Sequence, residues 1–203
     1  MENIHVILGS QSPRRRELME GLDIPFRSIV IDADETFPPD LTGGDIPAYI
    51  SRAKAKAYLP RLGEEELLIT ADTIVWLSRE CNGGYNKREE GMMLGKPTDA
   101  EDARRMLRLL SGRTHQVYTG VTFTRRDSME SIVDKTDVTF RRLSEEEIRY
   151  YVERYKPLDK AGAYGVQEWI GYVGVERING SYFNVMGLPV ERVYQFLIRQ
   201  IGL

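Results

Sequence analysis

The longest apolar run of the chain, Leu67–Leu77, sets the first limit on its fold. It reads Leu-Leu-Ile-Thr-Ala-Asp-Thr-Ile-Val-Trp-Leu, which is well short of the roughly 18 apolar residues of a membrane-spanning helix. Its β-branched residues favour a buried strand instead. Segments with helical spacing alternate with segments of strand character around it, without any repeat. The sequence therefore predicts an α/β fold and no membrane partner.

The chain is long enough to form its own core. It has 203 residues, of which 41% are hydrophobic, and a formal net charge of −3. At roughly 150 residues per domain, we expect a single domain over residues 1–203, built of two lobes without an independent boundary. The negative charge argues against nucleic acid as a partner, but it allows a local basic site for a small anion.

Cysteine and histidine are too scarce for most kinds of metal site. The sequence has one cysteine, Cys81, and two histidines, His5 and His115, which excludes a disulfide within the chain, a thiolate zinc cluster and a multi-histidine site. A metal ion would be held by carboxylates and water, which points to Mg²⁺ or Mn²⁺. The single cysteine, with no signal-peptide pattern, favours a cytoplasmic location.

Capping patterns and periodicity place the expected elements. Strands are expected over 5–8, 26–31, 67–77, 116–124 and 132–140, and helices from 13, over 47–59, from 98, from 144 and over 190–201. Ser12 is the expected N-cap of the first helix, and Thr98–Glu101 and Ser144–Glu147 have the pattern of capping boxes. We expect a long hairpin or flexible loop over 78–93 and a glycine-rich loop region with short strands over 161–187. The last helix should carry Val190, Val193, Tyr194, Leu197 and Ile201 on its apolar face.

Three consecutive arginines, Arg14–Arg16, stand in the first turn of the first expected helix. The N-terminus of a helix already has a partial positive charge, so cations there are unfavourable unless an anion lies opposite. A strand, a Gly-Ser loop with Ser10 and a helix start with arginines can together bind phosphate. The alternative is a solvated basic turn on an exposed helix.

Asp72 stands within the apolar run. A carboxylate in such surroundings is costly unless a cation, a metal ion or hydrogen bonds compensate it, so Asp72 is a candidate general base or metal ligand. The alternative is that strand alternation places Asp72 on a wet face together with Thr70 and Ile74. The residues alone leave both possibilities open.

Two lysines and a glutamine are weaker candidates. Lys96, in Leu94-Gly-Lys-Pro97, and Lys54 could each meet a phosphate, although the first does not have Walker spacing and a lone lysine is more often a surface charge. Gln167 follows the small residues of Ala161-Gly-Ala-Tyr-Gly-Val. Its amide offers a donor and an acceptor, which suits the edge of a pyrimidine base, and the alternative is a turn with a surface glutamine. We interpret His115 as a packed or exposed histidine rather than a base.

Taken together, these segments resemble the Maf family of nucleoside triphosphate pyrophosphatases. The matching stretches are Leu8-Gly-Ser-Gln-Ser-Pro-Arg-Arg15, Lys54-Ala55, Ala71-Asp-Thr-Ile-Val75, Leu94-Gly-Lys-Pro97, Leu110-Ser-Gly112, His115–Val121, Ala161-Gly-Ala-Tyr-Gly-Val-Gln167 and Asn179–Pro189. The form of the stretch that ends at Gln167 resembles the branch that hydrolyses dTTP and UTP. There are two departures: Gly9 replaces the usual alanine, and the 78–93 stretch is longer than usual.

The resemblance implies a fold and a reaction. The fold is an elongated mixed sheet flanked by helices, like that of Maf and ITPase proteins, with two lobes and a central cleft. The enzyme, a hydrolase of nucleotide metabolism, cleaves between the α- and β-phosphates with the help of a divalent metal ion, Mg²⁺ or Mn²⁺. It is often a homodimer. The alternatives are a pyrophosphatase for modified or other nucleotides, and a non-hydrolytic nucleotide-binding regulator of cell division.

The resemblance also implies roles for individual residues. Asp72 is the catalytic proton acceptor and, with Glu35, lies at the metal centre. The residues around the phosphates are Ser10, Arg14, Arg15, Lys54 and Lys96, and those linked to base choice are Arg14, Thr73 and Gln167. Asp72 could accept a proton from the attacking water or hold the metal ion, and the sequence does not separate these two roles.

Overall fold

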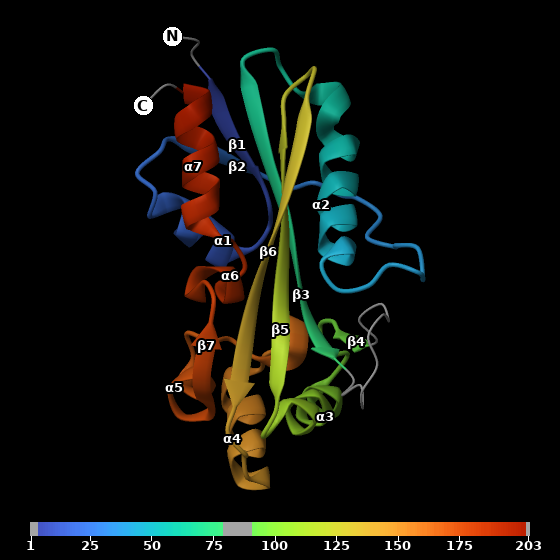
Figure 1. Ribbon diagram of the computed structural model, residues 1–203, viewed down its shortest axis with the longest axis vertical. Coiled ribbons are helices and arrows are strands. Elements are labelled where there is room, and N and C mark those ends of the chain that lie inside the picture. Colours follow the sequence, from blue (N-terminus) through green and yellow to red (C-terminus); the bar gives the residue numbers. More distant parts are fainter. Residues whose placement is uncertain (1–3, 79–90, 202–203) are drawn as a thin grey trace, which may run out of the picture. The chain divides into compact units, whose positions relative to one another are not determined.

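The computed structural model describes residues 4–78 and 91–201, which form a mixed sheet with helices (Figure 1). The strands are β1 (His5–Gly9), β2 (Phe26–Ile29), β3 (Glu66–Ser78), β4 (Gly91–Leu94), β5 (Thr114–Thr124), β6 (Met129–Phe140) and β7 (Val175–Asn179). The α-helices are α1 (Pro13–Glu20), α2 (Asp45–Tyr58), α3 (Ala100–Leu110), α4 (Glu145–Tyr155), α5 (Trp169–Gly174), α6 (Tyr182–Met186) and α7 (Val190–Ile201), with 3₁₀ turns at Leu59–Arg61 and Ala161–Ala163.

The chain divides into two compact units that share its three long strands. Unit 1 comprises Met1–Thr73, Thr119–Asp134 and Gly187–Leu203, and unit 2 comprises Ile74–Tyr118 and Lys135–Met186. The backbone passes from one unit to the other four times, and three of these passages lie within β3, β5 and β6. The strand order is β2-β1-β3-β5-β6-β7, with β4 also paired to β3. The predicted mixed sheet flanked by helices is confirmed, while the cleft stays a prediction.

Unit 1 is built on parallel strands. β1 pairs in parallel with both β2 and β3, so that Leu8 lies opposite Ser28 on one side and Ile69 on the other. Parallel neighbours need crossover connections, and α1 and α2 supply them. The last helix, α7, packs through Val193, Phe196 and Leu197, and the Phe196 ring stacks on Phe123 with 3.8 Å between ring centroids.

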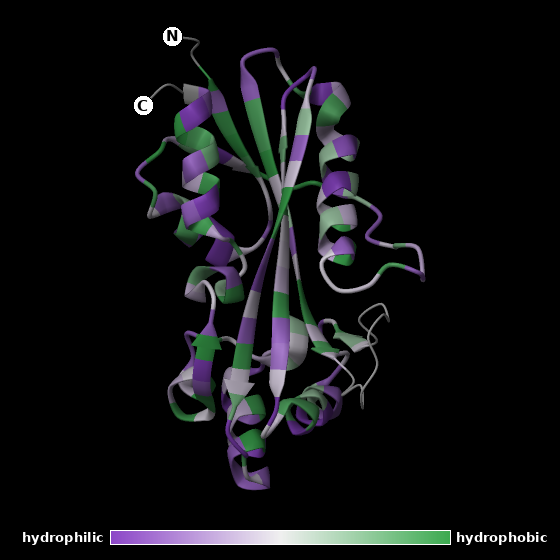
Figure 2. Ribbon diagram, viewed as in Figure 1, coloured by the Kyte–Doolittle hydropathy of each residue, from purple (hydrophilic) through white to green (hydrophobic). Residues whose placement is uncertain are grey.

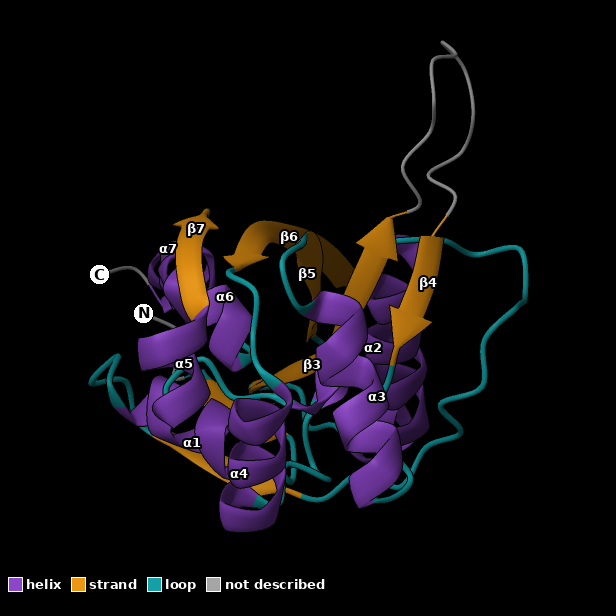
Figure 3. Ribbon diagram, turned by 90° about the horizontal axis from the view of Figure 1, so that it is seen from below, coloured by secondary structure: helices purple, strands orange, loops and turns teal. Residues whose placement is uncertain are grey.

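Unit 2 has the larger core cluster. β4 pairs antiparallel with the end of β3 (Figure 3), and β7 pairs antiparallel with β6. The predicted apolar face of α3 is buried and consists of Ala103, Met106, Leu107 and Leu110. On α4, the buried residues are Ile148, Tyr151 and Val152. Bands of hydrophobic and hydrophilic residues alternate along both helices (Figure 2), as expected for helices with one buried face.

Most predicted boundaries agree with the structure to within a few residues, and three expectations were wrong. The N-cap of α3 is Asp99, not Thr98, because its carboxylate accepts a hydrogen bond from Asp102 N at 2.8 Å. The 161–187 stretch holds two short α-helices and a 3₁₀ turn besides its strand. Its glycines allow close packing: a Cβ at Gly171 would lie 1.7 Å from Val166 O. Tyr194 was expected on the buried face of α7 but is 40% exposed, whereas Phe196 is buried.

The capping box of α4 is confirmed, since Ser144 and Glu147 each bind the other's backbone N–H. The hairpin expected over 78–93 is confirmed at its ends, where Ser78 pairs with Gly91. Residues 79–90, with Cys81, lie outside the described residues. None of the helices that the structure describes is long and apolar enough to cross a membrane.

His115 lies in the core of unit 2, so of the two placements expected for it, packed or exposed, the packed one is found. Its side chain is fully buried, its Nε2 lies 2.8 Å from the hydroxyl of Tyr164, and its ring meets Phe140 edge-on. Its Nδ1 has no hydrogen-bond partner among the described residues. Burial lowers the pKa of His115 to about 3, so the ring is neutral at physiological pH.

The buried ring should make stability depend on pH. In the unfolded chain a histidine has a pKa of about 6.5, whereas the pKa of folded His115 is about 3. Between these two values the unfolded state binds more protons, so this contribution to stability is complete above pH 6.5 and is lost as the pH falls. We expect the free energy of unfolding to drop by up to about 1.4 kcal/mol per pH unit in that window.

Urea denaturation between pH 4.5 and 7.5 measures this slope. His115→Gln should flatten it, because the titrating group is gone. His5→Gln is the matched control, since it removes an imidazole from an exposed position. The same pH slope in both variants would contradict the assignment.

Candidate functional site

The turn between β1 and α1 is held by hydroxyl groups. Ser10 Oγ accepts a hydrogen bond from Ser12 N at 3.2 Å, and Ser12 Oγ accepts one from Arg15 N at 3.4 Å. The second contact confirms Ser12 as the N-cap. Ser28 Oγ lies 3.3 Å from Ser10 O and ties the turn to β2. Ser10 is 8% exposed. The turn therefore has a defined shape, as a phosphate-binding loop requires.

Arg15 points into unit 1 rather than into solvent. Its Nε donates to Gly187 O at 2.8 Å, its Nη1 to Ala71 O at 2.8 Å and its Nη2 to Thr73 Oγ1 at 2.9 Å. Burial lowers the pKa of Arg15, and the charge of Asp72 opposes that shift. One guanidinium group therefore joins α1 to β3 and to the start of the α7 segment.

The partners of Arg15 are themselves fixed. Thr73 Oγ1 lies 2.9 Å from Thr119 Oγ1 and 3.3 Å from Gly187 O. Gly187 has φ +123°, a conformation that residues with a side chain rarely adopt. Thr73, which the resemblance links to base choice, thus belongs to the cluster of Arg15, Thr73, Thr119 and Gly187.

Lys54 of α2 brings two predicted site residues together. Its Nζ lies 2.9 Å from Asp72 Oδ1 and 2.9 Å from Glu35 Oε1. The side chains of Lys54 and Asp72 are only 12% and 15% exposed, whereas Glu35 is 56% exposed. The ion pair offsets part of the cost of placing Asp72 in an apolar strand.

This geometry corrects two of the alternatives. Thr70 and Ile74, the neighbours of Asp72 on its face of β3, are buried, so the strand has no wet face there. Lys54 is not a solvated surface lysine. Both residues are partly buried because α2 packs tightly on β5: a Cβ at Gly120 would lie 2.4 Å from the backbone of Pro47. Ser51 strengthens the contact through Thr122 Oγ1 at 2.8 Å.

The carboxylates of Asp72 and Glu35 are suitable ligands for a magnesium ion. Among residues 4–78 and 91–201, no group of three or more histidine, cysteine or acidic side chains could hold a metal ion. Mg²⁺ commonly binds one or two carboxylates and takes its other ligands from water and substrate phosphates. The donor set near Lys54 therefore fits Mg²⁺ or Mn²⁺ better than a metal that needs a complete protein cage.

Of the remaining predicted site residues, Arg14 lies in the first turn of α1 in unit 1, and Lys96 and Gln167 lie in unit 2. Lys96 is exposed and follows β4, and its neighbour Gly95 accepts a hydrogen bond from Gly162 N at 3.0 Å. That contact joins the Lys96 segment to the loop that carries Gln167. The side-chain oxygen of Gln167 is buried and has no hydrogen-bond partner in the part of the chain that the structure describes. Gln167 is therefore not simply a surface glutamine.

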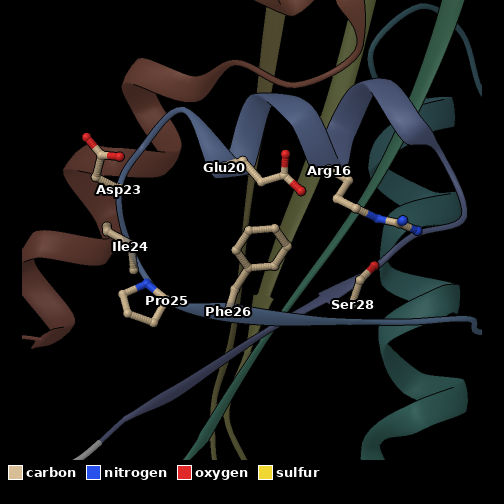
Figure 4. Close-up of a pocket in the computed structure, with 7 residues that line it drawn as sticks. All are labelled: Arg16, Glu20, Asp23, Ile24, Pro25, Phe26 and Ser28. Atoms are coloured by element: carbon tan, nitrogen blue, oxygen red, sulfur yellow. The ribbon is translucent and has the colours of Figure 1, made fainter.

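A separate hollow in unit 1 lies between α1 and β2 (Figure 4). Its volume is about 650 Å³, and its lining residues are Arg16, Glu20, Asp23, Ile24, Pro25, Phe26 and Ser28. None of the predicted site residues is among them. Arg16 lines this hollow, whereas the side chain of the neighbouring Arg15, which is partly buried, contacts β3 and Gly187.

The chain is similar to known proteins over nearly its whole length. Residues 5–200 match the family of Maf-like proteins. The chain belongs to the Maf family. A Maf relative from Bacteroides thetaiotaomicron, named "dTTP/UTP pyrophosphatase", is 52% identical, and the match covers 96% of this chain and 95% of that protein. Another of the same name, from Parabacteroides distasonis, is 50% identical over 97% of this chain and 96% of its own length.

A solved structure shows a fold like that of this Maf protein. The Ham1 protein of Staphylococcus aureus matches with a TM-score of 0.53 and 15% identity, over 97% of this chain and 99% of that chain. At this identity the similarity concerns the fold alone. It supports the predicted mixed sheet flanked by helices.

Sequence reasoning missed several residues that contact the predicted site residues or lie beside them. Thr119 and Gly187 support Arg15 and Thr73 in unit 1, and both lie inside stretches that carry the family resemblance. In unit 2, Tyr151 and Glu168 contact each other beside Gln167. No local pattern marks these residues, because their partners are distant in the sequence.

Replacing Arg15 should cost stability. Arg15→Lys removes the planar group that binds three acceptors, and a lysine at the same depth cannot reach all of them. We expect the free energy of unfolding to fall by about 2 to 4 kcal/mol, as measured by urea denaturation. The matched control is Arg16→Lys, at an exposed position, which should cost less than about 0.5 kcal/mol. Equal costs would contradict the structural role of Arg15.

Proposed function

We propose that this protein is a nucleoside triphosphate pyrophosphatase that hydrolyses dTTP and UTP between the α- and β-phosphates. The observation that carries the proposal is the partly buried Asp72, held at 2.9 Å by Lys54, which also holds Glu35. The names of Maf relatives that are 50% and 52% identical support the choice of substrate. The products are dTMP or UMP and pyrophosphate.

Asp72 acts as the proton acceptor in this scheme. Lys54 holds Oδ1, and we assign the accepting role to Oδ2. The oxygen of a water molecule attacks the α-phosphorus, and the proton of that water passes to Asp72. The bond from the α-phosphorus to the bridging oxygen breaks, and pyrophosphate leaves with the electron pair. Asp72 as a metal ligand remains the alternative role.

Positive charge would stabilise the leaving group. We propose that Ser10, Arg14, Arg15, Lys54 and Lys96 supply donors for the phosphates, as the resemblance implies. Arg15 donates to Ala71, Thr73 and Gly187. A guanidinium group has further N–H groups, which can donate to a phosphate. Glu35 would hold the divalent ion, joined by Asp72 in its alternative role as a metal ligand. When bound, this ion neutralises phosphate charge and lowers the pKa of coordinated water.

Base choice is assigned to Arg14, Thr73 and Gln167. The amide of Gln167 can donate to and accept from the edge of uracil or thymine, and its side-chain oxygen has no partner among the described residues. Thr73 acts through the Arg15 cluster, because its hydroxyl already lies within hydrogen-bond distance of three other groups. A pyrimidine triphosphate is therefore the substrate class that we favour.

The setting of the enzyme is part of the same proposal. A pyrophosphatase for free nucleotides acts where those nucleotides are, which is consistent with a cytoplasmic protein. The net charge of −3 gives no general attraction for nucleic acid, and the partner is the nucleotide itself. The homodimer that the resemblance implies stays a prediction, and light scattering at several concentrations tests it.

Pyrophosphate release from a panel of nucleotides tests the function directly. The panel contains UTP, dTTP, CTP, GTP and 7-methyl-GTP, each with Mg²⁺, with Mn²⁺ and with chelator. We expect fast release from UTP and dTTP that the chelator abolishes, with the monophosphate as co-product. Release from another base only would keep the reaction and overturn the substrate choice. Binding without any release would favour the regulatory alternative.

Asp72→Asn should reduce turnover of UTP by at least a factor of about 100, as is typical when a general base is lost. Circular dichroism and thermal unfolding check that the variant folds. Asp127→Asn changes an exposed carboxylate just after β5 and should retain normal turnover, which makes it the matched control. Near-normal turnover of a folded Asp72→Asn protein would refute the assignment.

A further inference from the structure

A cluster of three polar side chains in unit 2 contacts the loop that carries Gln167. It consists of Tyr151 of α4, Lys160, which precedes the loop, and Glu168, which follows Gln167. We call these three residues the Tyr151 cluster. The Tyr151 hydroxyl donates to Glu168 Oε2, and Lys160 Nζ lies 3.1 Å from Glu168 Oε1. Each oxygen of the Glu168 carboxylate thus has its own partner.

Two members of the cluster are buried, and the side chain of Glu168 is 19% exposed. Tyr151 is fully buried and belongs to the main hydrophobic cluster of unit 2, and Lys160 is 8% exposed. Burial and the neighbouring Glu168 raise the pKa of Tyr151, so its hydroxyl keeps its proton and remains a donor. Buried ion pairs of this kind contribute little net stability compared with apolar packing. A role in fixing a conformation explains them better.

The conformation that the cluster fixes is that of the segment from Gly165 to Glu168. Gly165 N donates to the Tyr151 hydroxyl at 3.0 Å, and Glu168 N donates to Gly165 O at 3.0 Å. A Cβ at Gly165 would lie 2.9 Å from Glu168 Cδ and 3.1 Å from Lys160 Cε. The Tyr151 hydroxyl therefore contacts both ends of this four-residue turn, and Lys160 contacts the Glu168 end.

Gln167 lies inside that turn, one residue before Glu168. The side-chain oxygen of Gln167 has no hydrogen-bond partner in the described part of the chain, so no hydrogen bond of that oxygen fixes its direction. Its direction depends on the backbone on either side of it. A turn that relaxes by a few tenths of an ångström would misalign an amide that must make a donor and an acceptor contact together.

We propose that Tyr151 and Glu168 are positioning residues that set the base preference of the enzyme by holding Gln167 in place. The inference rests on the proposed function, in which the Gln167 amide reads the edge of uracil or thymine. Lys160 completes the arrangement, because its Nζ lies 3.1 Å from Glu168 Oε1 as well as 2.8 Å from Asp159 Oδ1. Neither Tyr151 nor Glu168 touches the substrate in this proposal.

The test compares kcat/KM for UTP with kcat/KM for CTP, because this ratio does not depend on the fraction of protein that is folded. In Tyr151→Phe we expect the ratio to fall about tenfold, toward the value of Gln167→Ala, through a higher KM for UTP. Glu168→Gln keeps an acceptor for the Tyr151 hydroxyl and should retain more of the preference. It also keeps the test available if Tyr151→Phe does not fold. Tyr172→Phe is the matched control, since Tyr172 is 83% exposed, and should leave the ratio unchanged.

The outcomes separate this inference from the proposed function. A lower ratio in both Gln167→Ala and Tyr151→Phe, with no further loss in the double variant, supports the positioning role. A lower ratio in Gln167→Ala alone overturns that role. An unchanged ratio in Gln167→Ala overturns the base-reading role and the inference with it, while hydrolysis of UTP would still stand. No hydrolysis by the unmodified enzyme refutes the proposed function itself.

Discussion

The ion pair between Lys54 and Asp72 allows a carboxylate to stand in the most apolar strand of the protein. Asp72 is only 15% exposed, and its neighbours Thr70 and Ile74 are buried. Without a cation at 2.9 Å, the desolvation of this carboxylate would oppose the folding of β3. The close packing of α2 on β5 places that cation. The packing of unit 1 and the chemistry proposed for Asp72 therefore depend on the same contact.

Arg15 shows why the arginine triplet is tolerated at the start of a helix. Successive helical residues are about 100° apart around the axis, so one of three can face β3 while its neighbours face elsewhere. Arg15 finds three acceptors there, and Arg16 lines the hollow beside β2. The backbone oxygens of Ala71 and Gly187 and the hydroxyl of Thr73 supply the acceptors. Oxygen atoms of the protein thus provide part of the negative charge that the arginines at the start of α1 require.

The sequence predicted the helices and strands of this fold well, but it did not predict the contacts between residues that are distant along the chain. The α4 capping box, the apolar face of α3 and the β3 strand follow from local patterns, which is why they were confirmed. Lys54 and Asp72 were each expected at the site, but their ion pair was not predicted. The distance between them depends on how α2 packs against the sheet, which no local sequence pattern shows. The inward turn of Arg15 depends on Gly187, 172 residues away. No local pattern contains that information.

The same physical device occurs in both units with different consequences. In unit 1 Lys54 compensates the partly buried Asp72, to which we assign the chemistry. In unit 2 Lys160 compensates Glu168, the residue after Gln167. Buried charges are costly, so each must be satisfied by a partner in one geometry. This requirement makes such groups good at fixing position, which a loosely packed apolar contact cannot do as well.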